Sequence, residues 1–234
     1  MESLSEAWQA VFEQQARPDT SVVLTTAAVA VAVVLYLPSW RIARHVVTIA
    51  HEASHGFAAV ASGRRLSGIR LHSDTSGVTV SSGKRTGIGM VVTAAAGYLG
   101  PALIGLAAAL TLGAGYALAV LWGLLVLLAL LLIQIRNWFG LWSVLVSGGV
   151  VFAITWWAPE SVQSGFAYLV TWFLLVAAPR PVVELQVERR RRRSTASDAD
   201  QLARLTFLPA VAWVGLFLLG TLGALAVGAV VLWR

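Results

Sequence analysis

Long apolar runs separated by short polar segments make up most of this chain. Most of the runs are about 20 residues long, the length that an α-helix needs to cross the hydrocarbon core of a bilayer. The pattern predicts an all-α polytopic membrane protein with about six to seven transmembrane segments. The approximate bounds of the segments are 21–38, 40–62, 88–112, 116–135, 138–157, 165–178 and 207–233.

Residues 66–83 break the helical pattern. Two pairs of apolar residues alternate with polar ones on either side of the turn-forming segment 73–77: Ile69 and Leu71 before it, Val78 and Val80 after it. A period of two is typical of β-strands, so the segment predicts a β-hairpin. An open sheet cannot satisfy its edge hydrogen bonds in hydrocarbon, so we expect the hairpin at the membrane surface.

The remaining polar segments suggest how the chain is organised. Residues 1–20 carry four acidic residues against one arginine and place apolar side chains at helical spacing. We therefore expect an amphipathic or soluble segment there, followed by a single membrane domain over 21–234. Residues 180–205 contain the run Arg189–Arg193 and are expected to form a basic loop. Basic loops of membrane proteins face the cytoplasm, which places this loop, Arg136 and the hairpin on the cytoplasmic side.

Composition supports a membrane protein and limits the chemistry. Of the 234 residues, 58% are hydrophobic and 12% are charged, whereas about 25% of residues are charged in soluble domains. The net charge of +6 comes from basic residues that flank apolar runs. The lipid bilayer, and not nucleic acid, is therefore the expected partner. The chain has no cysteine, so any metal must be held by nitrogen and oxygen ligands.

The pentapeptide His51-Glu52-Ala53-Ser54-His55 carries the clearest chemistry. Histidines four residues apart lie on the same face of a helix, so both imidazoles can reach one metal ion. The intervening Glu52 can act as general base toward a water molecule activated by that ion. Ionisable groups at membrane depth are costly and usually functional. The motif therefore predicts one zinc ion per chain, bound by His51 and His55.

A catalytic zinc ion normally has three protein ligands and one open position. Five residues are candidates for the third ligand: Asp198, Asp200, Asn137, His72 and Asp74. Asp198 and Asp200 follow Ser197, a good N-cap, so a capping role explains them equally well. Asn137 is neutral and a poorer ligand. His72 and Asp74 flank the hairpin turn, where aspartate is common for conformational reasons.

Gly97-Tyr98-Leu99-Gly100-Pro101 interrupts an apolar run with small residues and a proline. Small residues permit close helix packing. A functional interpretation is that Gly97 and Gly100, with a weaker contribution from Asn137, bind an extended substrate beside the metal.

Taken together, these residues resemble the site-2 protease-like family of intramembrane zinc peptidases, and in particular its compact branch common in actinobacteria. The matching pieces lie within about residues 45–225: HEASHG at 51–56, Gly63, GVT at 77–79, AAGYLGPAL at 95–103 and SDA at 197–199. The resemblance implies that His51 and His55 bind zinc, that Glu52 is the base, and that a later aspartate is the third ligand. The family's LDG-type or NPDG-type motif is missing, and Asp198 in the SDA segment is the predicted substitute.

The resemblance implies an intramembrane zinc metalloprotease in the bacterial cytoplasmic membrane. It would hydrolyse peptide bonds in or near transmembrane segments of membrane-protein substrates, and the hairpin could hold an extended substrate by strand addition. One alternative is a catalytically inactive relative that binds or sequesters a client, as the missing motif would favour. Another is a metal transporter. The near absence of acids and histidines in the spans after residue 86 disfavours that function.

Overall fold

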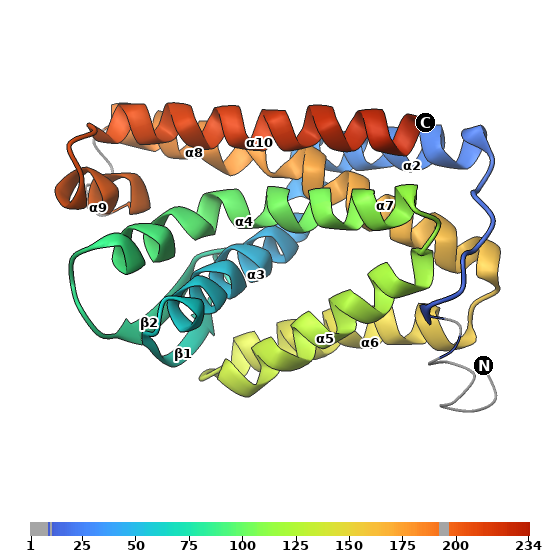
Figure 1. Ribbon diagram of the computed structural model, residues 1–234, viewed down its shortest axis with the longest axis horizontal. Helices are drawn as coiled ribbons and strands as arrows, with labels where there is room; N and C mark the ends of the chain where they lie inside the picture. The colour runs from blue at the N-terminus through green and yellow to red at the C-terminus, as the bar shows by residue number, and fades with distance from the viewer. Residues whose placement is uncertain (1–8, 10, 192–196) are drawn as a thin grey trace.

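The computed structural model describes residues 9, 11–191 and 197–234. Of the amphipathic or soluble segment expected over 1–20, residues 1–8 and 10 lie outside the described residues. The described chain is a bundle of long helices with a small two-stranded sheet at one end (Figure 1). Its elements are α2 (Thr20–Leu35), α3 (Leu37–Ala61), β1 (Arg65–Leu71), β2 (Gly77–Ser82), α4 (Ile88–Gly113), α5 (Ala117–Gln134), α6 (Trp138–Trp157), α7 (Glu160–Ala177), α8 (Pro179–Arg190), α9 (Asp198–Leu205) and α10 (Ala210–Trp233).

The helices confirm an all-α polytopic membrane protein. Within the described residues, five helical segments are long and apolar enough to span a membrane: α4, α5, α6, the α7–α8 pair and α10. Helices α2 and α3 pass the same test only as a pair, and they are bent by 102° where they meet. The predicted segments 21–38 and 40–62 correspond to this bent pair. Counted as one broken span, the pair brings the number of candidate spans to six.

The bend between α2 and α3 begins at Tyr36, whose backbone is extended. The first predicted segment ends at residue 38, but Pro38 lies in the first turn of α3. A proline is tolerated there because the first amides of a helix have no partner within the helix. Ser39 covers the break by donating a hydrogen bond to the carbonyl oxygens of Val33 and Tyr36, at 2.9 Å each.

Most of the segment 180–205 is helical, so the expectation of a basic loop was wrong for α8 and α9. Each of these two helices buries a pair of apolar residues three positions apart. The pairs are Val182 with Leu185 and Ala199 with Leu202, and all four join one apolar cluster with α4 and α10. This burial favours helical structure despite the arginines.

Long polar side chains link helix α8 to the start of α3. The indole of Trp40 donates a hydrogen bond to Glu184 at 2.9 Å. Arg44 and Arg180 form ion pairs with the same carboxylate, at 3.4 and 3.2 Å. The Arg180 guanidinium also lies 4.5 Å from the centre of the Trp40 ring. Glu184 therefore compensates the charge that Arg44 brings into the broken span.

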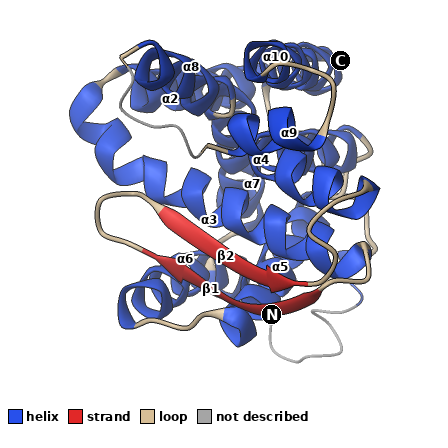
Figure 2. Cartoon of the chain, turned by 90° about the vertical axis from the view of Figure 1, so that its left-hand side faces the viewer, coloured by secondary structure: helices blue, strands red, loops and turns tan. Residues whose placement is uncertain are grey.

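The hairpin expected over 66–83 is confirmed. Strands β1 and β2 are antiparallel, with Ile69 opposite Thr79 and Leu71 opposite Gly77. Figure 2 shows both strands running side by side across this end of the bundle, close to α3. Ile69 and Leu71 are buried, and the Ile69 side chain would lie 3.2 Å from a Cβ at Gly56 of α3. One face of the hairpin is therefore packed on α3.

The second edge of β1 is occupied by the short link between α5 and α6. The backbone amide of Arg136 donates to the Ile69 carbonyl oxygen at 2.9 Å. Asn137 binds Leu71 at two points: its amide group donates to the Leu71 carbonyl at 2.6 Å and accepts from the Leu71 amide at 3.1 Å. Among the described residues, β2 pairs with no strand other than β1.

We expect Asn137→Ala to loosen the hairpin by removing both hydrogen bonds to Leu71. Each such bond contributes on the order of 0.5–1.5 kcal/mol, so amide exchange over residues 66–83 should rise about tenfold or more. Hydrogen–deuterium exchange of the detergent-purified protein measures this. The control is Ser143→Ala, which removes only a local hydrogen bond to Phe139 within α6. Equal exchange in both variants would contradict the assigned role of Asn137.

Candidate metal centre

Helix α3 presents His51 and His55 on one face. His55 and Glu52 are buried, with exposed fractions of 9% and 5%, and His51 is partly buried. The Nε2 atoms of the two histidines lie 3.1 Å apart. The single-turn spacing expected of the motif is therefore realised, and both nitrogens point to the same place.

Asp198 at the start of α9 completes a cluster with the two histidines. Its Oδ2 atom lies 3.3 Å from His51 Nε2 and 3.2 Å from His55 Nε2. In the part of the chain that the structure describes, these residues form the only group of three or more His, Asp or Glu side chains close enough to share an ion. Three donors at zinc–ligand distances of about 2.0–2.1 Å in a tetrahedral site lie about 3.3–3.4 Å from one another. The cluster thus fits a zinc ion.

Electrostatics also favours a cation at this point. Burial on its own would raise the pKa of Asp198. The hydrogen-bonding contacts with His51 and His55 outweigh it, so the pKa lies below its usual range and the carboxylate is ionised. The anionic oxygen faces two imidazole nitrogens, so positive charge must be supplied there by protons or by a metal ion.

The backbone of α4 orients one of the histidines. His55 Nδ1 lies 2.7 Å from the carbonyl oxygen of Thr93. Because a carbonyl only accepts, Nδ1 carries a hydrogen, so Nε2 is the nitrogen through which the neutral ring would bind a metal. Sequence reasoning missed Thr93. Its one signal was a polar residue four positions before Gly97, on the same face of an apolar helix.

Asp200, an alternative third ligand, is committed to the start of α9. Its carboxylate accepts hydrogen bonds from the Ser197 amide at 3.2 Å and hydroxyl at 2.6 Å, while the Ser197 side chain accepts from the Asp200 amide. Arg189 of α8 forms an ion pair with the same carboxylate. Asp200 therefore caps the helix on which Asp198 meets the histidines.

The other candidate ligands also lie outside the cluster. Asn137 is bound to Leu71 in the hairpin. Asp74 accepts hydrogen bonds from the hydroxyl and the amide of Ser76, at 2.6 and 3.0 Å, within the hairpin turn. His72 Nδ1 lies 3.2 Å from the same hydroxyl. These contacts explain all three residues without a metal.

Gly97 and Gly100 lie where α4 packs on α3. A Cβ at Gly97 would lie 2.3 Å from His55 Nε2 and 2.6 Å from His51 Nε2, and one at Gly100 would lie 1.9 Å from the Ser54 hydroxyl. The contacts give both glycines a packing role. The substrate contact expected of them stays a prediction. At position 97 even a methyl group would fill the space beside the metal-binding nitrogens.

Two aromatic rings lie beside the site, next to Gly97. The ring of Tyr98 meets the edge of the His51 ring, with centroids 4.8 Å apart. On its other side Tyr98 stacks on Phe217 of α10 at 5.2 Å. The His51 ring, carried by α3, is therefore also held in place by Tyr98 of α4, which preorganises the ligand.

We expect Gly97→Ala to abolish zinc binding in a folded protein, because the new methyl group would contact both Nε2 atoms. Zinc content per chain after metal loading measures the effect. Gly223→Ala is the matched control, since a Cβ there meets no atom within 4 Å. Stoichiometric zinc in the Gly97→Ala variant would refute this account of the site.

Asp198→Ala and Asp200→Ala separate ligation from capping. Loss of a direct ligand should lower zinc affinity by more than 100-fold, beyond the roughly 10–100-fold typical of outer contacts. The Asp200 variant should still bind one zinc, with affinity within about tenfold of the wild type. Competition titration against a chelator gives both values. The reverse order of the two variants would make Asp200 the ligand.

Comparison with known proteins agrees with this geometry. A family model described as Peptidase M50B-like matches residues 24–228, a range that includes the whole His51, His55 and Asp198 cluster. Searches of curated proteins and of solved structures gave no match. The matched range covers most of the chain and confirms the site-2 protease-like resemblance. The chain therefore belongs to the peptidase M50B-like family.

Proposed function

We propose that the protein is an intramembrane zinc metalloprotease that hydrolyses peptide bonds in or near transmembrane segments of other membrane proteins. The observation that carries the proposal is the convergence of His51, His55 and Asp198 at mutual distances of 3.1–3.3 Å. Family membership supports peptidase chemistry. The five to six candidate spans support a location within the membrane.

His51, His55 and Asp198 would hold the metal. When bound, zinc supplies a Lewis acid that polarises a carbonyl oxygen and lowers the pKa of a coordinated water toward neutrality. Three protein ligands leave a fourth position open, as catalytic zinc sites require. Because the chain has no cysteine, the nucleophile at this site would be water and not a thiol.

Glu52 follows His51 directly and is the one carboxylate of the pentapeptide. Its carboxylate would take a proton from the attacking water as the new carbon–oxygen bond forms at the substrate carbonyl. It would then give the proton to the nitrogen of the leaving amine as the carbon–nitrogen bond breaks. The 5% exposure of Glu52 keeps bulk water away from this transfer.

The substrate segment must be extended where it is cut, because the amides of an intact helix are shielded by their own hydrogen bonds. The hairpin offers a place for such a segment. Strand β1 is paired on both edges, by β2 and by the 135–137 link, whereas β2 pairs with β1 alone among the described residues. Strand addition at the outer edge of β2 would place the substrate beside α3.

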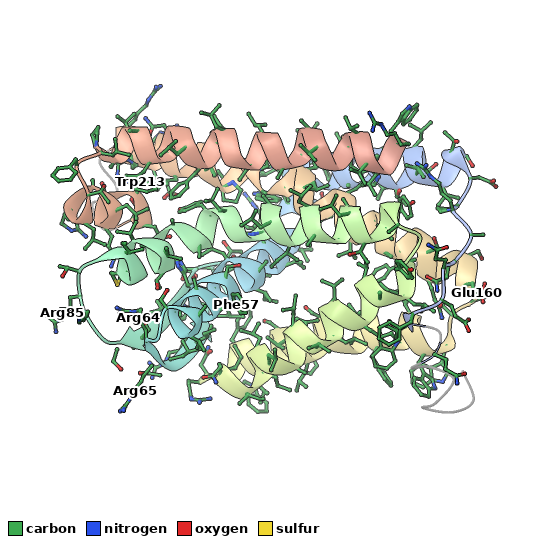
Figure 3. All side chains as sticks on the ribbon, in the orientation of Figure 1. Phe57, Arg64, Arg65, Arg85, Glu160 and Trp213 are labelled. Atoms are coloured by element: carbon green, nitrogen blue, oxygen red, sulfur yellow. The ribbon has the colours of Figure 1, made fainter. Side chains whose placement is uncertain are left out.

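Charge supports a cytoplasmic position for the hairpin end. Arg64, Arg65 and Arg85 lie at this end of the bundle, and Glu160 lies at the other (Figure 3). Arg136 also lies next to β1. Under the positive-inside rule the hairpin and α9 would face the cytoplasm. Together with the resemblance to a branch common in actinobacteria, this supports our proposal of a bacterial cytoplasmic membrane.

The test is Glu52→Gln. Wild type and variant are reconstituted in liposomes with a panel of doubly tagged single-span proteins, and cleavage is followed by gel. We expect one zinc in each protein, cleavage by the wild type, and a rate about 100-fold or more lower in the variant, because general acid–base catalysis contributes about 10²–10⁴-fold.

Two outcomes would contradict this function. Cleavage by Glu52→Gln at the wild-type rate would remove the role given to Glu52. Zinc binding and client binding by a wild type that cuts no member of the panel would favour the second candidate, a client-binding protein derived from a peptidase.

A further inference from the structure

A hydroxyl on strand β2 contacts the proposed general base. Thr79 Oγ1 lies 2.7 Å from Glu52 Oε2 and 3.0 Å from the backbone carbonyl oxygen of Glu52. The two residues are 27 positions apart and belong to different elements, the hairpin and α3. Both acceptors belong to Glu52, so the threonine hydroxyl is directed at this one residue.

Gly77 allows the strand to come this close. A Cβ at position 77 would lie 2.5 Å from Glu52 Cγ and 2.7 Å from Glu52 Oε1. Alternate residues of a strand share a face, so Gly77 and Thr79 both face α3. The Glu52 side chain therefore lies against the backbone at one position of β2 and is hydrogen-bonded at the next position on that face.

The strand itself is fixed at the same two positions. Thr79 is paired with Ile69 and Gly77 with Leu71. Behind them, Arg136 binds the Ile69 carbonyl, and Asn137 binds Leu71. On the turn side, Thr48 of α3 donates to the carbonyl oxygen of Thr75 at 2.8 Å.

We propose that Thr79 is a positioning residue that holds the Glu52 carboxylate in its working orientation. A free glutamate side chain samples many rotamers, and catalysis needs one of them. A charge-assisted hydrogen bond of 2.7 Å selects that rotamer. The inference rests on the proposed function, and it adds that β2 both aligns the base and offers its outer edge to the substrate.

The first experiment compares Thr79→Val, which keeps the shape of the side chain, with Thr79→Ser, which keeps the hydroxyl. The control is Ser81→Ala, because Ser81 on the same strand bonds only Arg64 among the described contacts. We measure zinc content, and kcat and KM on a cleaved member of the liposome panel. Thr79→Val should keep one zinc and lose about 10–100-fold in kcat, as expected for a lost hydrogen bond to a charged group. Its KM should stay within about twofold.

The expected pattern is completed by Thr79→Ser and Ser81→Ala, both close to the wild type. Three outcomes would overturn the proposal. They are a Thr79→Ser variant as impaired as Thr79→Val, loss of zinc in Thr79→Val, and an unchanged kcat in Thr79→Val. The first two would make Thr79 a purely structural contact between the hairpin and α3.

A second measurement needs no turnover. Acetohydroxamic acid would chelate zinc through its two oxygens and pass its hydroxyl proton to a neighbouring base, so its Kd reports the Glu52 position. We expect Thr79→Val to weaken acetohydroxamate binding about tenfold in the wild-type background and to have no effect in the Glu52→Gln background. Equal effects in both backgrounds would refute the coupling. If the wild type cleaves nothing, the peptidase proposal fails while this cycle still decides the role of Thr79.

Discussion

The rest of the structure depends on bringing an aspartate and two histidines, one buried and the other two groups partly buried, together at one end of a largely apolar bundle. Taking such groups out of water is costly unless they find partners or a metal. The chain meets this requirement with a backbone carbonyl for His55, an aromatic ring for His51 and a capped helix for Asp198. The helix packing around the cluster follows from the need to bring these three side chains together.

The carboxylate of the cluster comes from a short helix, α9, outside the long spans. Helix α8 connects it to the rest of the molecule at two polar points. Glu184 binds the start of α3, and Arg189 pairs with Asp200 at the start of α9. A ligand more than 140 residues from the histidines in sequence is thereby held against them.

Local patterns predicted much of this from sequence. Helical spacing put His51 and His55 on one face, and alternation predicted the hairpin. The points that local patterns left open or got wrong depended on contacts with other elements. Ser197-Asp198-Ala199-Asp200 reads equally well as a cap or a ligand, and the contacts of Asp200 with Ser197 and Arg189 assign it to the cap. Likewise, the partner of Asn137 is a strand 66 residues away, and the apolar contacts that make α8 a helix come from other elements.

The absence of a side chain at Gly97 also fixes how α3 and α4 assemble. A Cβ at this position of α4 would lie against both imidazole nitrogens. The close approach of α4 at Gly97 leaves the two rings little room to swing away, and the Thr93 carbonyl of the same helix fixes one of them. A metal ion would therefore meet histidines whose orientation helix packing has already set.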